Sequence, residues 1–283
     1  MSEDVYVDFL HPVLVAGAAA LQKHQPVKKR LRLAPGVTSY AETIGLNDVL
    51  NGYDPRPPQK YKTYSGLTKL NSPELVEQVS GVISDFVYVA YRDFDTVATL
   101  IAKSIGELHD NVTSHSRGTG YSCAQIYKND LWFVVADNGI GMKRNVARIE
   151  PVQSDYEAIE WCLKKNNTTA RQIDEFAQRL PADAFQNPYP PSVSIVQEDY
   201  PNHHQGLGLW HLSELVRKTS GDLHIWSGSS QFIAKPSGVS KRDTSRIWEG
   251  TLLCIRLPLE PNHTEMSQWN QSLEELSKRL GIT

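Results

Sequence analysis

The stretch FVVADNGIGM, residues 133–142, decides the fold of this chain. Its apolar run is typical of a buried strand, and the run ends in Asp137, which Gly139 and Gly141 follow. A carboxylate is therefore expected at a strand end, beside backbone that can take unusual dihedral angles. Such a group can accept a hydrogen bond from the exocyclic amine of adenine, and the glycines let a flat base approach. In isolation, an ordinary Asp-Asn-Gly turn explains the stretch equally well.

The residues just before this stretch predict a β-hairpin. YSCAQIY (121–127) and LWFVVAD (131–137) read as β-strands. They are joined by Lys128-Asn129-Asp130, a sequence typical of a hairpin turn. Asp137 therefore ends the second strand of the hairpin.

Two long helices are expected ahead of the hairpin, over residues 72–91 and from an N-cap at Asp93 to about Ser114. In the second helix, apolar residues recur at helical spacing and form a core-facing stripe. This stripe consists of Val97, Leu100, Ile101, Ile105 and Leu108.

A polar row lies beside that stripe on the second helix. In GELHDNVTSHS (106–116), Glu107, Asn111 and His115 are four residues apart, so all three lie along one helix face. The pattern is common on solvated helix faces, and it identifies no site by itself.

A glycine-rich turn opens a later helix. HHQGLGLWHLSELV (203–216) places Gly206, Leu207 and Gly208 immediately before a helix expected from Leu209 to Lys218. Main-chain amides and the positive end of the helix dipole then point at the loop, an arrangement that suits a polyphosphate. A dinucleotide site is disfavoured, because the three-glycine fingerprint after a strand is absent.

Between these motifs lies a segment rich in Asn, Gln and Pro, residues 142–205, in which SDYEAIEWCLKK (154–165) predicts a helix. A connection this long is typical of a functional lid or a disordered segment. The chain after it predicts three strands and a final amphipathic helix, over residues 222–228, 231–235, 246–259 and 263–283.

The first fifty residues alternate between strands and helices, which favours a small α/β module. The expected elements cover residues 5–10, 12–24, 28–33 and 38–50. YDPRPPQKYKTYSG (53–66) contains three prolines and is the best candidate linker. We therefore predict a boundary near residue 60, with domains at 1–60 and 61–262 and the helix at 263–283.

Composition bounds the function classes. The 283 residues carry a net charge of -3 and only three cysteines, Cys123, Cys162 and Cys254, which are far apart and lack metal-ligand spacing. No signal peptide or membrane-spanning run is recognisable. We expect a cytoplasmic protein with no nucleic-acid partner and no membrane partner.

The order of the motifs resembles the histidine-kinase-like (GHKL) ATPase superfamily over roughly residues 93–258. The resemblance implies an α/β sandwich with a mixed sheet backed by helices and a long ATP lid at about residues 142–205, with ATP and Mg²⁺ as ligands. In it, Asn111 coordinates magnesium, Glu107 polarises the attacking water or hydroxyl, and Asp137 recognises adenine. By the same resemblance, Gly139 and Gly141 shape the base pocket, and Gly206, Leu207 and Gly208 form the phosphate loop. Thr251 supports Asp137, and His115 lies near phosphate or ribose.

Within the superfamily, ELHDNVTSHS and GLGLWHLSELV look most like the anti-sigma-factor serine kinase branch. The stretches FLHPVLVAGAAALQ, RLRL and YAETIGLNDVL look like a degenerate STAS module, the fold that such kinases bind and phosphorylate. Here His11-Pro12-Val13-Leu14 replaces the expected Asp-Ser-Ser-Gly acceptor. A protein partner or phosphoacceptor is expected, and a homodimer is a further expectation.

Two readings remain open. The first is an enzyme, either an ATPase or a serine/threonine protein kinase. The second is a non-catalytic switch, in which nucleotide binding changes affinity for a protein partner. A sensor histidine kinase is disfavoured, because His109 and His115, the histidines of the two long helices, both fall in the expected ATP site. A clamp of the gyrase type is disfavoured because the chain ends soon after the last predicted strand.

Overall fold

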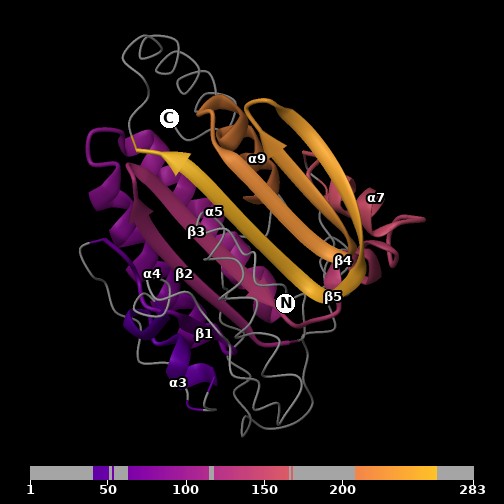
Figure 1. The fold of residues 1–283 in the computed structure, drawn as a ribbon, viewed down its shortest axis with the longest axis horizontal. Helices are drawn as coiled ribbons and strands as arrows, with labels where there is room; N and C mark the ends of the chain where they lie inside the picture. Colours follow the sequence, from indigo (N-terminus) through magenta and orange to yellow (C-terminus); the bar gives the residue numbers. More distant parts are fainter. Residues whose placement is uncertain are drawn as a thin grey trace, which may run out of the picture.

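A computed structural model describes residues 41–50, 53, 63–114, 118–165, 167 and 208–259. Over these residues the chain is an α/β protein built on a five-stranded sheet of order β1-β2-β3-β5-β4 (Figure 1). The elements, in chain order, are α3 (Leu46–Leu50), β1 (Thr68–Leu70), α4 (Pro73–Ala90), α5 (Asp95–Ser114), β2 (Gly120–Tyr127), β3 (Asp130–Asp137), α6 (Gly141–Val146), α7 (Asp155–Cys162), α9 (Gly208–Lys218), β4 (Asp222–Lys235) and β5 (Gly238–Pro258).

The expected mixed sheet is wrong for the described strands, because every neighbouring pair is antiparallel. Tight turns account for two of the pairs. Lys128 and Asn129, with φ of 50° and 63°, join β2 to β3 in the positive-φ geometry that suits a two-residue hairpin. A second turn, between Lys235 and Gly238, joins β4 to β5. The chain reverses direction there, and β5 then pairs with β4 on one side and with β3 on the other.

One face of the sheet is covered by α4, α5 and α9, which lie behind the strands in Figure 1. Alternate residues point to this face because successive strand residues point to opposite sides. The main core cluster is formed by these inward strand residues and by the apolar stripes of the helices. Its strand members include Ala124, Leu131, Phe133, Val135, Leu223, Ile225, Leu253, Ile255 and Leu257.

The opposite face packs against the segment that contains α3. Its cluster joins Ala41, Ile44, Leu46 and Val49 to Leu67 and to the other set of strand residues, Tyr121, Cys123, Val134, Ala136, Leu252 and Cys254. The expected helix over residues 38–50 is interrupted, because Gly45 has a φ of 83°. The domain boundary near residue 60 stays a prediction, since most of residues 1–60 lie outside the described part.

The two long helices largely confirm their predicted bounds. Ser72 caps α4, and its hydroxyl accepts a hydrogen bond from the Leu75 N–H at 3.3 Å. Tyr91 is the C-cap of this helix. The second helix, α5, begins at Asp95, one residue later than a cap at Asp93 would give, and it ends at Ser114 as predicted.

Two predicted strands are merged into one. β4 runs through both 222–228 and 231–235, with an irregular register at Gly228. Gly228 has a φ of 59°, and a Cβ there would collide with the carboxylate of Asp155 in the first turn of α7. That carboxylate accepts hydrogen bonds from the Ser229 N–H at 2.9 Å and from its hydroxyl at 3.0 Å. The bulge therefore anchors α7 to the sheet.

The beginning of the expected lid thus packs on the body. Residues 154–165 contain the predicted helix, observed as α7, and α6 precedes it. The rest of the lid, most of the N-terminal module and the C-terminal helix at 263–283 lie outside the described residues. No described helix is long and apolar enough to cross a membrane.

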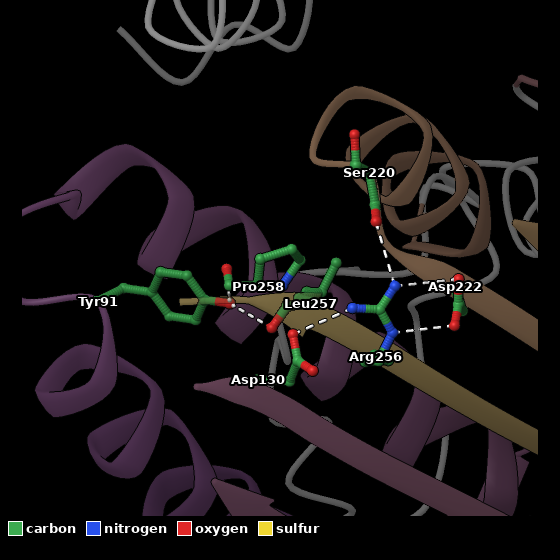
Figure 2. A network of polar contacts seen from close by, with 7 residues as sticks. All are labelled: Tyr91, Asp130, Ser220, Asp222, Arg256, Leu257 and Pro258. Carbon is green, nitrogen blue, oxygen red and sulfur yellow. Dashed lines mark hydrogen bonds and ion pairs between the residues drawn. The ribbon is translucent and has the colours of Figure 1, made fainter. Parts of the chain in front are cut away.

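A polar network ties several elements together at one end of the sheet (Figure 2). The Arg256 guanidinium donates to both carboxylate oxygens of Asp222, at 2.9 and 3.2 Å, and to Asp130 at 3.1 Å. It also donates to the main-chain oxygen of Ser220 at 3.3 Å. Nearby, the Tyr91 hydroxyl donates to the main-chain oxygen of Pro258 at 3.0 Å. We name this region the network end; it holds the start of β3 and the last residues of β5.

Candidate functional site

Asp137 lies at the other end of β3, and its side chain is only 7% exposed. One carboxylate oxygen accepts the Gly139 N–H at 2.7 Å, and the other accepts the Thr251 N–H at 3.2 Å. Thr251 therefore contacts Asp137 through its main-chain N–H, and the role in an ATP site that the resemblance gives it stays a prediction. These two bonds fix the orientation of the carboxylate.

The carboxylate points to the helix-covered face of the sheet. Asp137 follows Phe133 and Val135 at the strand period of two, and both of those residues belong to the main core cluster. Thr251 shares the side of Leu253 by the same rule. The sequence placed Asp137 at a strand end, and the fold adds that it faces the layer in which α5 and α9 lie.

Gly250 lies against Asp137 and Gly141 lies against Gly250, and neither glycine can carry a side chain without strain. Gly141 has a φ of 74°, and a Cβ there would lie 2.6 Å from the main-chain oxygen of Glu249. A Cβ at Gly250 would collide with the main-chain oxygen of Asp137 and lie 2.6 Å from its carboxylate. Both positions require glycine because of close approach, and the φ of Gly141 agrees with the unusual dihedral angles expected there from the sequence.

Ser227 fixes the position of these glycines. Its hydroxyl donates to the main-chain oxygen of Gly250 at 3.0 Å and accepts the Met142 N–H at 2.9 Å. The side chain is buried, with 1% exposure. It therefore holds the start of α6 against β5.

Glu107 contacts the first residue of α9. Its carboxylate accepts a hydrogen bond from the Gly208 N–H at 2.5 Å. A Cβ at Gly208 would lie 2.6 Å from that carboxylate oxygen, so a glycine permits the contact. Glu107 of the polar row on α5 and Gly208 of the glycine-rich turn are thus in contact, although they lie about one hundred residues apart in the sequence. Asn111 lies one turn further along α5 with an exposed side chain.

Gly120 connects the end of α5 to the aspartate. It pairs with Asp137 across β2 and β3, and a Cβ there would lie 2.5 Å from Val112 of α5 and 3.0 Å from the Ala136 main-chain oxygen. The turn before it is also tied to β3, since the Thr119 N–H donates to the Asn138 side-chain oxygen at 2.9 Å. The final turn of α5 therefore packs directly beside the strand end.

His109 is a core residue rather than a site residue, which corrects the expectation that it falls in the ATP site. Its side chain is completely buried, one ring nitrogen lies 2.9 Å from the Ser80 hydroxyl and the other 2.8 Å from the Ser122 hydroxyl. Burial lowers the pKa of His109 to about 3, so its ring is neutral. Both nitrogens join α5 to its neighbours.

Sequence reasoning identified Glu107, Asp137, Gly141, Gly208 and Thr251, all of which lie in these contacts. Gly139 also contributes, through its N–H. The expected contacts at His115, Gly206 and Leu207 lie outside the described residues. Two supporting residues were missed, Gly120 and Ser227; the run Gly118-Thr119-Gly120 carried a signal for the first, whereas nothing in the sequence marked the second.

No group of three His, Cys, Asp or Glu side chains in the described part of the chain is placed to hold a metal ion. The expected magnesium site uses one amide oxygen, that of Asn111, together with phosphate and water oxygens. It stays a prediction.

Comparisons with known protein families, with curated proteins and with solved structures find no match to this chain. The resemblance to the GHKL superfamily therefore stays a prediction from the order of the sequence motifs.

Proposed function

We propose that this protein binds ATP with Mg²⁺ in the manner of the GHKL superfamily, and that it hydrolyses ATP or transfers the γ-phosphate to a serine or threonine of a protein partner. The observation that carries the proposal is that four separate motifs meet on one face of the sheet. Glu107 contacts Gly208, α5 packs on Gly120 beside Asp137, and Asp137 accepts from Thr251.

Asp137 supplies the base-recognition end. Its carboxylate is held in place by two main-chain N–H groups, so its orientation is fixed before any ligand arrives. A buried acceptor that is fixed in this way discriminates strongly for a ligand that donates a hydrogen bond. The 6-amino group of adenine is such a donor.

Glu107 and Asn111 supply the phosphate end. Both lie on the same face of α5, one turn apart. Magnesium, when bound, neutralises phosphate charge and orients the terminal phosphate. The Asn111 amide oxygen is a ligand of the type that Mg²⁺ accepts, and the Glu107 carboxylate is the base that takes the proton of the attacking water or hydroxyl.

One observation favours the second candidate, a non-catalytic nucleotide switch. The Glu107 carboxylate is bonded to the Gly208 N–H at 2.5 Å, so in this arrangement it is committed to α9. If that contact persists with nucleotide bound, Glu107 positions a helix and takes no proton. Nucleotide would then alter the surface offered to a protein partner without turnover.

Calorimetric titration with ATP and a non-hydrolysable analogue, with and without Mg²⁺, tests the binding step, and ADP release from the same sample tests turnover. Glu107→Gln should still bind ATP but turn it over at least ~10²-fold more slowly, the scale of general-base catalysis. Glu77→Gln, at an exposed position on α4, is the matched control and should behave as wild type. Binding without turnover favours the switch, and no binding removes the proposal.

A further inference from the structure

The main chain of Asp137 is held by a tryptophan side chain. The indole N–H of Trp248 donates a hydrogen bond to the Asp137 main-chain oxygen at 3.1 Å. The regular ladder between β3 and β5 ends one residue earlier, at the pair of Ala136 with Leu252. The indole therefore extends the attachment of β3 to β5 by one residue, past the point where main-chain pairing stops.

Trp248 belongs to the layer that contains α3. Its ring is partly buried and packs against the cluster of that layer, as does the ring of Trp226, and the two ring centroids are 6.3 Å apart. The Asp137 carboxylate points to the other, helix-covered face. Contacts from both sides of the sheet therefore fix the position of Asp137.

The residues from Trp248 to Thr251 contact Asp137 in three places. Trp248 donates to its main-chain oxygen, Gly250 lies against its main-chain carbonyl group, and the Thr251 N–H donates to its carboxylate at 3.2 Å. The side chain of an aspartate is short, so the direction of the carboxylate follows the position of the main chain. Loss of the indole contact is therefore expected to change where the carboxylate points.

We propose that Trp248 is a positioning residue of the candidate site, and that its indole N–H aims the Asp137 carboxylate at an exocyclic amine of the bound base. This inference rests on the proposed ATP binding and adds a residue that determines specificity through another residue. A site built to hydrogen-bond one group of a ligand rejects the analogue that lacks this group, provided that the acceptor is held in place. Loss of the indole N–H should therefore reduce the preference for the amine.

Trp226 offers a matched control on the same face of the sheet. Its indole N–H also donates to a main-chain oxygen at 3.1 Å, that of Gly228, and its ring is the other member of the aromatic pair. Trp226→Phe and Trp248→Phe each remove one indole N–H and make one ring of the same pair smaller. The two variants differ in the main-chain oxygen that loses its donor, which belongs to Gly228 in the first and to Asp137 in the second.

The first measurement compares ATP with the triphosphate of purine riboside, which lacks the 6-amino group, by calorimetry on the full chain with Mg²⁺. Wild type should prefer ATP. Trp248→Phe should reduce this preference about fivefold, the change expected from one net hydrogen bond. Trp226→Phe should keep the wild-type preference, and denaturant unfolding should show a similar loss of stability in both variants.

A second measurement needs no nucleotide. The N–H groups of Gly139 and Thr251 donate to the Asp137 carboxylate, so amide hydrogen exchange at these two residues reports how firmly the carboxylate is held. Exchange should be about fivefold faster in Trp248→Phe than in Trp226→Phe, because one hydrogen bond fewer opposes the local opening. The amides of α4 serve as the reference for opening of the whole fold.

The possible failures are distinguishable. If wild type binds ATP but the two variants show the same ratio of the two affinities, the inference alone is wrong. An equal loss for both triphosphates in Trp248→Phe also overturns it, since the tryptophan would then support the fold of the site and not the direction of the carboxylate. If wild type binds neither triphosphate, the proposed function fails together with the role in specificity. The exchange rates still decide whether Trp248 holds Asp137, and equal rates in the two variants overturn that step.

Discussion

The two ends of β3 each carry a buried or half-buried aspartate, and they hold it by opposite means. At the network end, Asp130 faces the guanidinium of Arg256, which also makes a two-pronged contact with Asp222. At the site end, Asp137 is held by main-chain N–H groups of Gly139 and Thr251. One carboxylate is balanced by a long cationic side chain, and the other is oriented by backbone dipoles.

The difference separates stability from binding on a single strand. A guanidinium fills the space around its carboxylate and satisfies it with directional hydrogen bonds. Main-chain amides orient a carboxylate without covering it, and the nearby Gly141 and Gly250 add no bulk. We therefore expect substitutions at the network end to lower stability with ligand affinity intact, and substitutions at the site end to lower affinity, together with stability where a new side chain would collide with the main chain.

Gly250→Ala should have the largest effect, because the new Cβ would collide with the main-chain oxygen of Asp137. Relieving it requires a shift of β5 against β3, and we expect a loss of at least ~3 kcal/mol in the free energy of unfolding together with loss of ATP binding. Denaturant unfolding measures the first. The control is Gly81→Ala on α4, which meets no atom within 4 Å and should stabilise the helix by about 0.5–1 kcal/mol.

Asp137→Asn should have the second largest effect, a loss of affinity for ATP. An amide can keep one of the two N–H contacts, but it presents an NH₂ group where the second acceptor was and loses the charge. We expect ATP binding to weaken by about 100-fold, the value of a charged hydrogen bond and of the orientation it gives. Calorimetry measures this, and near wild-type affinity in the variant would remove the adenine role of Asp137.

Arg256→Ala should lower stability by about 2 kcal/mol, because it leaves two partly buried carboxylates without their cation. ATP affinity should be unchanged. Lower stability with unchanged affinity is the result expected for a substitution at the network end. Arg92→Ala is the control, since Arg92 pairs with Asp93 in a contact where both side chains are about 80% exposed, so little change is expected. A loss of affinity in Arg256→Ala would show that the two ends are coupled.

The smallest effect is expected at His109, which lies between the two ends of β3 and makes the stability of the fold depend on pH. Its pKa is about 3 in the folded chain and about 6.5 when unfolded, so the unfolded state binds more protons between these values. Stability is therefore lost as pH falls below about 6.5, by roughly 1 kcal/mol at pH 5.5. His109→Gln should reduce this dependence in unfolding curves at pH 7 and 5.5, even if its stability is lower at both.

The sequence predicted the parts of the site that depend on local pattern. The apolar run before Asp137, the spacing of Glu107 and Asn111, and the glycines ahead of α9 each follow from short-range chemistry. Helix and strand bounds agreed to within a residue or two for α4, α5, β2 and β3. These elements are long and periodic, which makes their patterns the most informative.

What depends on tertiary contact was not predictable. Nothing local indicates that His109 is enclosed by Ser80 and Ser122, or that Ser227 reaches the main chain of Gly250. The antiparallel course of β5 was also missed, because strand direction follows from chain connections rather than from composition. The bulge at Gly228 has the same origin, since it exists to admit a carboxylate from α7.

The alternation of side chains along β3 limits which insertions and deletions this strand can accept during evolution. Asp137 faces the α5 layer only because it is an even number of residues from Phe133 and Val135. Inserting or deleting one residue within the strand would turn the carboxylate toward the α3 layer, although every site residue would still be encoded. Natural variants can therefore exchange residue types on this strand, but a change of one residue in its length would separate the Asp137 carboxylate from the other residues of the candidate site.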